Sequence, residues 1–223
     1  MNIPDTLLSA GWFWAAWVVW GLVAAAGVRR APWGALRDPA RFNVWLGMVV
    51  LLTVLWSLKA GVKPGLDFHF VGAALFTLSV GSWLAFFGLS LVTAGAGFGA
   101  ETGFFAFGLN ALLVAGAGPL ISVGLLRLAE CHLPRQPFVY IFANGFFGAW
   151  LAVIGIGCCA AAILALDGAY TIDYLGSEYL PYVGLLGFAE AWLSGMMVTI
   201  FVIYRPSWIS TFNDARYLDS QQK

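Results

Sequence analysis

The sequence predicts an all-α, polytopic membrane protein, and three properties of the 223-residue chain lead to this fold class. The first is composition: 61% of the residues are hydrophobic and 10% are charged, whereas a soluble domain is about 25% charged. A chain with so little polar surface needs lipid as its solvent, where helices satisfy their own backbone groups. The second property is a series of long apolar runs, and the third is the distribution of arginine and lysine between them.

Five apolar runs approach or exceed the length of about 20 residues that a bilayer crossing needs. They lie near 11–28, 43–58, 103–126, 138–165 and 181–204. The region 68–98 is too long for one crossing, and Gly81-Ser82 is a break signal within it. Splitting the region there predicts a short helix, 68–80, and a second helix, 82–97, which gives seven helices in total.

The short helix at 68–80 would be about 20 Å long, whereas the hydrocarbon core is about 30 Å thick. The ends of such a helix expose unpaired backbone groups unless protein surrounds it or it lines a cavity. Broken helices are also a feature of transporter binding sites. We therefore interpret 68–80 as a half-length helix near a substrate site, with an ordinary tilted helix as the alternative.

The positive-inside rule favours seven helices over six and gives an orientation. Four arginines crowd the first connection and place it in the cytoplasm: Arg29, Arg30, Arg37 and Arg41. With seven helices, only Lys59 and Lys63 of the eleven basic residues stay outside. We therefore predict one domain, 1–223, in a bacterial inner membrane, with residues 1–10 as an external N-terminal plug and 205–223 as a cytoplasmic tail.

Several classes of function lack their motifs in this chain. No Gly-Lys-Ser/Thr sequence occurs, so any transport driven by ATP needs a separate ATPase subunit. Neither Gly-x-Ser-x-Gly nor His-Glu-x-x-His occurs, and we expect no enzyme. A formal net charge of zero gives no basic patch for nucleic acid. The adjacent Cys158 and Cys159 are predicted to pack in the core.

A few polar residues inside the apolar segments are candidates for a site. Glu190 lies mid-helix in GFAEAWLSGMM, and an acidic side chain there costs about 2.5–3.5 kcal/mol on insertion scales, so we expect it to face a cavity or a partner. Asn110 and Asn144 raise the same question at lower cost. His69 lies near Asp67, where the external connection enters the short helix. For each, an ordinary structural or interfacial role is the alternative.

Four stretches of the chain, in the right order, resemble the CbiM/NikM family, the substrate-binding membrane components of cobalt and nickel energy-coupling-factor transporters. The first three are MNIPDTLLS, FHFVGAALFTLSVGSWLAFFGLSLV and TGFFAFGLNALLVAGAGPLIS. They are similar to the family's Met-His-Ile-Pro start, its His-Leu-x-Gly-Ala segment and its helix ending in Gly-Pro. In the fourth stretch, the last helix, Gly187 and Glu190 match a Gly-x-x-Glu signature.

The resemblance implies an energy-coupling-factor ABC transporter permease that takes up a transition-metal ion similar to cobalt or nickel. It implies separate ATPase and scaffold transmembrane subunits, and no permanently bound cofactor, because the metal is the cargo.

The resemblance also implies a metal site made of Met1, Asn2 and His69. In the family, the ligands are the N-terminal amine, the amide nitrogen and side chain of a second-residue His, and a His at the start of the short helix. Nitrogen donors of this kind suit Ni(II). Here Asn2 replaces the family His, and its amide is a poorer ligand. Three further residues are predicted to support the site: Asp67, Asn110 and Glu190.

Two other functions remain open at this point. The same fold could bind a small organic substrate such as a vitamin, stacked on aromatic residues near the external face: Trp12, Trp14, Phe68 and Phe70. The chain could also be a membrane assembly factor or a sensor with no transport cycle. The metal hypothesis makes the most specific prediction, which is that Met1, Asn2 and His69 converge on one external pocket.

Overall fold

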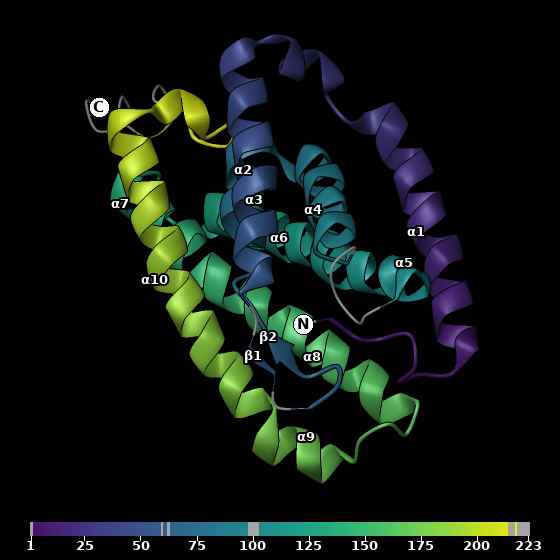
Figure 1. Cartoon of the computed structure of the whole chain (residues 1–223). Helices are drawn as coiled ribbons and strands as arrows, with labels where there is room; N and C mark the ends of the chain where they lie inside the picture. The colour runs from purple at the N-terminus through teal and green to yellow at the C-terminus, as the bar shows by residue number, and fades with distance from the viewer. Residues whose placement is uncertain (1, 59, 62, 98–102, 214–216, 218–223) are drawn as a thin grey trace.

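The structure is a computed structural model that describes all residues except 1, 59, 62, 98–102, 214–216 and 218–223 (Figure 1). Six longer helices form most of the bundle: α1 (Ala10–Arg30), α2 (Pro39–Ser57), α4 (Ser82–Gly97), α6 (Gly118–His132), α8 (Gly148–Leu166) and α10 (Leu180–Tyr204). Four shorter ones complete it: α3 (Ala73–Val80), α5 (Phe107–Ala111), α7 (Pro137–Tyr140) and α9 (Ile172–Glu178).

Several short helical segments adjoin these helices. The 3₁₀ turns are Trp33–Arg37, Phe104–Ala106 and Pro206–Trp208, and the π-helical stretches are Leu112–Ala117 and Ile141–Phe147. The π-helical stretches join α5 to α6 and α7 to α8, so each pair forms one continuous helical segment. A short antiparallel pair of strands, β1 (Ala60–Gly61) and β2 (Asp67–Phe68), lies in the connection between α2 and α3.

Five continuous helical segments of the described chain are long and apolar enough to cross a membrane. They are Ala10–Arg30, Pro39–Ser57, Phe104–His132, Pro137–Leu166 and Ile172–Tyr204. Helices α3 and α4 supply the two remaining apolar segments. The described residues therefore confirm the predicted all-α polytopic fold with a seven-helix arrangement.

The predicted break at Gly81 is confirmed, but the short helix begins later than predicted. Gly81 has a φ of 86°, a conformation that favours glycine, and it separates α3 from α4. Helix α3 starts at Ala73, not at residue 68, because residues 67–72 are extended or turn-like. His69 therefore lies in the segment before the helix and does not open it. All eight residues of α3 are buried, so protein surrounds this half-length helix as expected.

The two ends of the bundle hold different connections. Figure 1 shows the link between α1 and α2 at the same end as the C-terminal end of α10, and the β strands with α9 at the other end. The start of α1 belongs to this second end, because Ser9 binds Asp167, which directly follows α8. Helix α1 thus begins at one end of the bundle and α10 finishes at the other, as an odd number of crossings requires.

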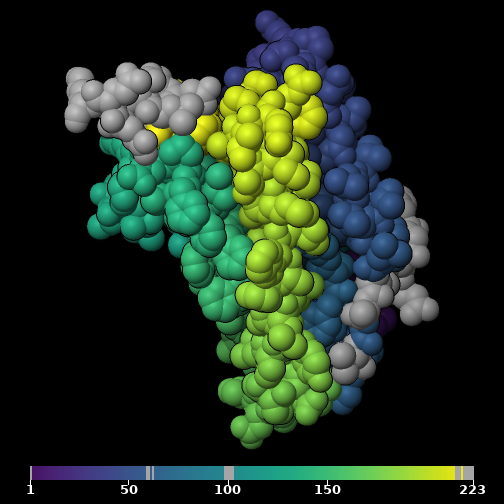
Figure 2. Space-filling view, turned by 90° about the vertical axis from the view of Figure 1, so that its left-hand side faces the viewer, coloured from purple at the N-terminus to yellow at the C-terminus, as the bar shows by residue number. Residues whose placement is uncertain are grey.

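Residues just beyond α10 return to the bundle instead of leaving it. Ser210 donates a backbone hydrogen bond to the carbonyl of Ser79 at the end of α3, with an N–O distance of 2.9 Å. The side chains of Ile209 and Phe212 are buried. The first part of the predicted tail is therefore packed structure. Figure 2 shows α10 running along one face of the molecule toward this segment.

The prediction that Cys158 and Cys159 pack in the core is wrong. Both side chains are exposed on the surface of α8. Because α8 is apolar on all sides, the periodicity of its sequence does not distinguish a core face from a lipid face.

Candidate functional site

The N-terminal segment folds back into the helix bundle and is held there by Asn110. The side chain of Asn110 accepts a hydrogen bond from the backbone N–H of Ile3 at 2.9 Å and donates one to the Ile3 carbonyl at 3.0 Å. Asn2 and Ile3 are both buried. One amide side chain thus satisfies both backbone groups of residue 3, as a neighbouring β-strand would. This contact fixes the position of the first residues of the chain.

Two further contacts hold the rest of this segment. The Asp5 carboxylate lies directly against Gly103, where an added Cβ atom would overlap it. Gly103 also has a φ of 73°, so both space and backbone conformation favour glycine. At the start of α1, the Ser9 hydroxyl donates to Asp167 at 2.7 Å. Residues 2–9 are therefore anchored at three points to other parts of the chain.

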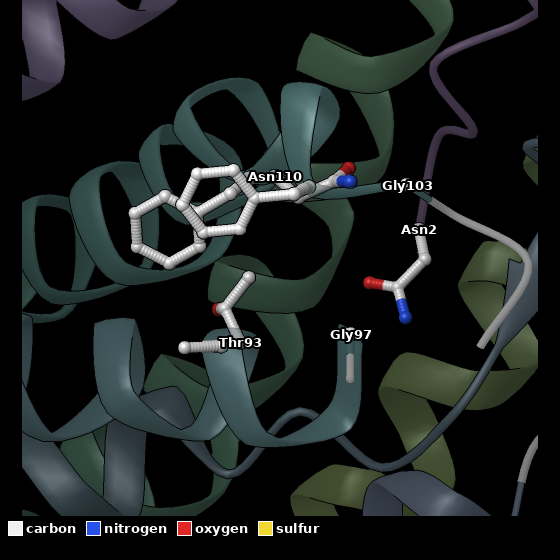
Figure 3. Close-up of a pocket in the computed structure, with 8 residues that line it drawn as sticks. Asn2, Thr93, Gly97, Gly103 and Asn110 are labelled. Atoms are coloured by element: carbon white, nitrogen blue, oxygen red, sulfur yellow. The ribbon is translucent and has the colours of Figure 1, made fainter. Parts of the chain in front are cut away.

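A pocket of about 240 Å³ lies beside Asn2 (Figure 3). Its polar and aromatic lining consists of Asn2, Thr93, Phe104, Phe107 and Asn110. Small residues complete the described part of the wall: Ala94, Gly97 and Gly103. Figure 3 shows the amide of Asn2 directed toward the side of the pocket formed by Thr93 and Gly97. The end of α4, the start of α5 and the N-terminal segment therefore enclose this space together.

His69 is buried against Trp56 of α2. The centroids of the two rings lie 4.3 Å apart at an angle of 41°, and His69 is 2% exposed. Its Nδ1 atom lies 3.2 Å from the carbonyl oxygen of Phe70. Packing against a large buried ring restricts the rotamers of the imidazole.

Glu190 of α10 holds the segment that directly follows His69. Its two carboxylate oxygens accept hydrogen bonds from the backbone N–H groups of Val71 and Gly72, at 2.7 and 2.6 Å. Gly72 is the N-cap of α3 and has a φ of 70°. The carboxylate therefore pairs with orphan amides at a helix N-terminus, where a negative charge is favourable. The predicted burial of Glu190 is confirmed, and its partner is the backbone of the turn before α3.

The charge of Glu190 changes the electrostatics near His69. A helix N-terminus carries a partial positive charge that would repel a cation. A carboxylate placed directly before α3, on the amides of Val71 and Gly72, offsets this charge. The region around His69 is therefore better suited to a cation than the helix end alone would be.

The structure brings some of the predicted site residues together and leaves others untested. Asn2 and Asn110 line one pocket, and Glu190 fixes the turn that follows His69. Asp67 lies over Gly61 in the neighbouring strand. Met1 lies outside the described residues, so its convergence with Asn2 and His69 stays a prediction. The described residues contain no cluster of three or more His, Cys, Asp or Glu side chains.

Sequence reasoning missed several residues of this region. Trp56, Thr93, Phe104 and Phe107 were not singled out, because each resembles an ordinary residue of an apolar helix. No local pattern marks them, since they contact the site only through tertiary packing. Gly103 is the exception. Glycine in a Gly-rich stretch of sequence is a turn signal, and the structure gives Gly103 the positive φ of such a turn.

Two of the aromatic residues predicted to stack on an organic substrate, Phe68 and Trp14, pack against different partners. Phe68 stacks on Tyr179 with ring centroids 5.6 Å apart, whereas Trp14 packs against Phe105 at 5.1 Å. Trp14 is also exposed on α1. The stacking platform expected for a vitamin is therefore not formed by these two residues.

Two solved structures share this fold. A truncated transition metal transporter superposes with a TM-score of 0.78 at 17% sequence identity, covering 92% of this chain and 99% of the other. A second transition metal transporter gives a TM-score of 0.73 at 18% identity, covering 91% and 93% of the two chains. Comparison with curated proteins gives no match.

A family comparison identifies the relationship over nearly the whole chain. Residues 2–208 match the family CbiM, described as the cobalt uptake substrate-specific transmembrane region. The match includes the N-terminal segment, which Asn110 holds, and the short helix with Glu190, which holds the turn after His69. This multi-pass membrane protein therefore belongs to the CbiM family.

Proposed function

We propose that this chain is the substrate-binding membrane subunit of an energy-coupling-factor ABC transporter that takes up a transition-metal ion similar to cobalt or nickel. Its family is one of metal uptake. Coupling to ATP hydrolysis requires partner subunits, an ATPase and a scaffold transmembrane protein, because the sequence contains no Walker A motif.

The observation that carries the proposal is the fixed N-terminal segment. Asn110 binds both backbone groups of Ile3 inside the bundle, so the amine and first amide nitrogen of the chain would be held in place as ligands. If residues 2–9 served only as a connection to α1, Ile3 would not need to be buried. We propose Met1, Asn2 and His69 as the metal ligands.

The surroundings of His69 support the same assignment. Trp56 restricts the imidazole, and Glu190 fixes the next turn of backbone while it offsets the charge of the helix end. Amine, amide and imidazole nitrogens together suit Ni(II) and related ions. Asp67, Asn110 and Glu190 are proposed as supporting residues, not as ligands.

The test is metal content after purification from cells grown with added Ni²⁺ or Co²⁺. The protein should carry a native N-terminus and a C-terminal tag without histidine, and elemental analysis should find metal bound. We expect His69→Ala, and separately a short extension before Met1, to remove the metal. His132→Ala is the matched control, because His132 is the other histidine of the chain and is exposed at the end of α6. If the extended protein and His69→Ala retain full metal, this site is wrong.

We also propose that the N-terminus is external and the C-terminus cytoplasmic in a bacterial inner membrane. The support is the excess of arginine near the α1–α2 connection and after α10, which share one end of the bundle. A reporter fused to the C-terminus that is active only in the periplasm would contradict this orientation.

A further inference from the structure

An apolar bay of about 440 Å³ lies between α1 and the helical segment that ends in α6. Val23 borders it on α1, Trp83 at the start of α4, and Gly116 and Leu120 on the third side. The described residues of its wall carry no charge. Leu120 is 74% exposed, so the bay opens onto the outer surface of the bundle. In a multi-pass membrane protein this surface meets lipid.

The bay exists because α1 contacts the bundle at two separate places. Near the start of α1, Trp17 packs on α5, where an added Cβ atom on Gly108 would lie 3.0 Å from the Trp17 backbone. Near its end, Gly27 makes room for the ring of Trp83, which lies 2.9 Å from the position of a Cβ atom. Val23 lies between these contacts and is only partly buried. Figure 1 shows α1 at the edge of the bundle, where lipid can reach the space that it leaves.

Two polar groups border this otherwise apolar space. They are the hydroxyl of Ser82 and the indole N–H of Trp83, and neither forms a hydrogen bond within the described part of the chain. Tryptophan is enriched at the level of the lipid headgroups, where its ring is apolar and its N–H is solvated. Both groups can donate to oxygen acceptors, and the ester and phosphate oxygens of a phospholipid are acceptors of this kind.

Arg30 supplies a positive charge at one end of the bay. It follows Gly27 by three residues and Val23 by seven, so the three lie on one face of α1. At a rise of 1.5 Å per residue, Arg30 lies about 4.5 Å beyond the contact of Gly27 with Trp83. Its side chain is exposed and forms no ion pair with another described residue. An anionic headgroup at this end would be complementary in charge.

The size of the bay favours a lipid chain over a helix of a partner protein. An α-helix about 10 Å wide occupies roughly 400 Å³ per turn, so the bay has room for one turn only. An acyl chain is thinner and flexible, and it can enter beside Leu120 and fill the space along its length. It would also cover the apolar wall without leaving polar backbone groups inside.

We propose that the bay binds the acyl chain of one anionic phospholipid, with the phosphate at Arg30 and the ester region at Ser82 and Trp83. Such a lipid fills the gap between the two contacts of α1 and stabilises the helix that follows the N-terminal segment. This site is separate from the proposed metal site and does not depend on it.

The test measures lipid binding to the delipidated full chain in a mild detergent by native mass spectrometry. Phosphatidylglycerol and phosphatidylcholine with the same acyl chains are the two probes. We expect one tightly bound phosphatidylglycerol, held at least about fivefold more tightly than phosphatidylcholine, which is the effect of one arginine beside a headgroup. Arg30→Gln should bind the two lipids equally. Arg127→Gln should keep the preference, because Arg127 is an exposed arginine on α6 that does not border the bay.

Gly116→Leu and Gly124→Leu form a matched pair for the bay itself. Both glycines belong to the helical segment Phe104–His132. An added Cβ atom on Gly116 would meet the side chain of Leu112 at 3.7 Å, and one on Gly124 would meet nothing within 4 Å. Both variants should therefore fold. We expect only Gly116→Leu to lose the tightly bound lipid, because Gly116 borders the bay and Gly124 does not.

Equal binding of the two lipids to the parent protein would overturn this inference, and so would retention of the lipid in Gly116→Leu. If Gly116→Leu keeps the lipid but no longer assembles with a scaffold transmembrane subunit, the bay receives a helix of that partner and the inference is wrong. Neither result concerns bound metal, so the proposed function stands or fails separately.

Discussion

The two ends of the short helix α3 are satisfied in different ways. At its start, a carboxylate from α10 accepts hydrogen bonds from the amides of Val71 and Gly72. At its end, neutral groups from the segment after α10 bind the free carbonyls: Ser210 N–H reaches Ser79, and Thr211 Oγ1 reaches Leu78 at 2.9 Å. Both ends lie within the bundle, where unpaired backbone groups are costly.

The difference shows where charge is needed and where it is not. Helix ends need only hydrogen-bond partners to be stable, and the neutral arrangement at the end of α3 meets this need. The start of α3 uses a buried charge instead, and it is the end next to His69. A buried carboxylate is the more costly solution, so its presence at this end supports a role in accommodating a cation.

The largest expected effect comes from removing the charged cap. Glu190→Leu leaves the amides of Val71 and Gly72 without an acceptor, and losing hydrogen bonds to a charged group costs about 1.5–3 kcal/mol each. We expect a large drop in the thermal unfolding temperature in detergent and a loss of bound metal.

Glu190→Gln separates the two roles of this residue. It retains one acceptor oxygen but removes the charge, so we expect a folded protein with weaker metal binding. Equal metal affinity in Glu190→Gln and the parent would show that the charge has no role at the site.

A second comparison uses the glycines that bound α3. Gly72 and Gly81 both have positive φ, so an alanine at either position introduces backbone strain of about 1–3 kcal/mol. Gly72→Ala should also displace Leu52, which an added Cβ would contact, and disturb the turn held by Glu190. We therefore expect both variants to unfold at lower temperature, but only Gly72→Ala to lose metal affinity. A loss of affinity in Gly81→Ala of the same size would mean that the two ends of α3 are equally coupled to the site.

The smallest effect is expected at the neutral end. Thr211→Val removes the hydroxyl that donates to Leu78 and contacts the Tyr140 hydroxyl at 2.6 Å. The backbone bond of Ser210 remains, so we expect a destabilisation of about 2 kcal/mol, the loss of two neutral hydrogen bonds at about 1 kcal/mol each. Thermal unfolding should show this change while metal content stays the same. Reduced metal content would indicate that the segment after α10 also influences the site.

Much of the fold could be predicted because lipid imposes a simple local rule. Each crossing requires a run of apolar residues, and such runs are visible in the sequence without knowledge of any partner. The break at Gly81 was predicted for a similar reason, since a run of 31 residues exceeds one crossing. The start of α3 was not, because the turn before it is held by Glu190, which is 118 residues away from Gly72.

The sequence by itself determined that this chain is a multi-pass α-helical membrane protein of the CbiM family, and that a carboxylate at position 190 needs a partner. Only the tertiary structure decided which partner it has, that Asn110 holds Ile3, and that residues after α10 cover the end of α3. The physical reason is that the two effects depend on different amounts of the chain. Hydrophobicity acts through the solvent and can be read residue by residue, whereas a buried hydrogen bond requires two groups that are brought together only when the helices pack.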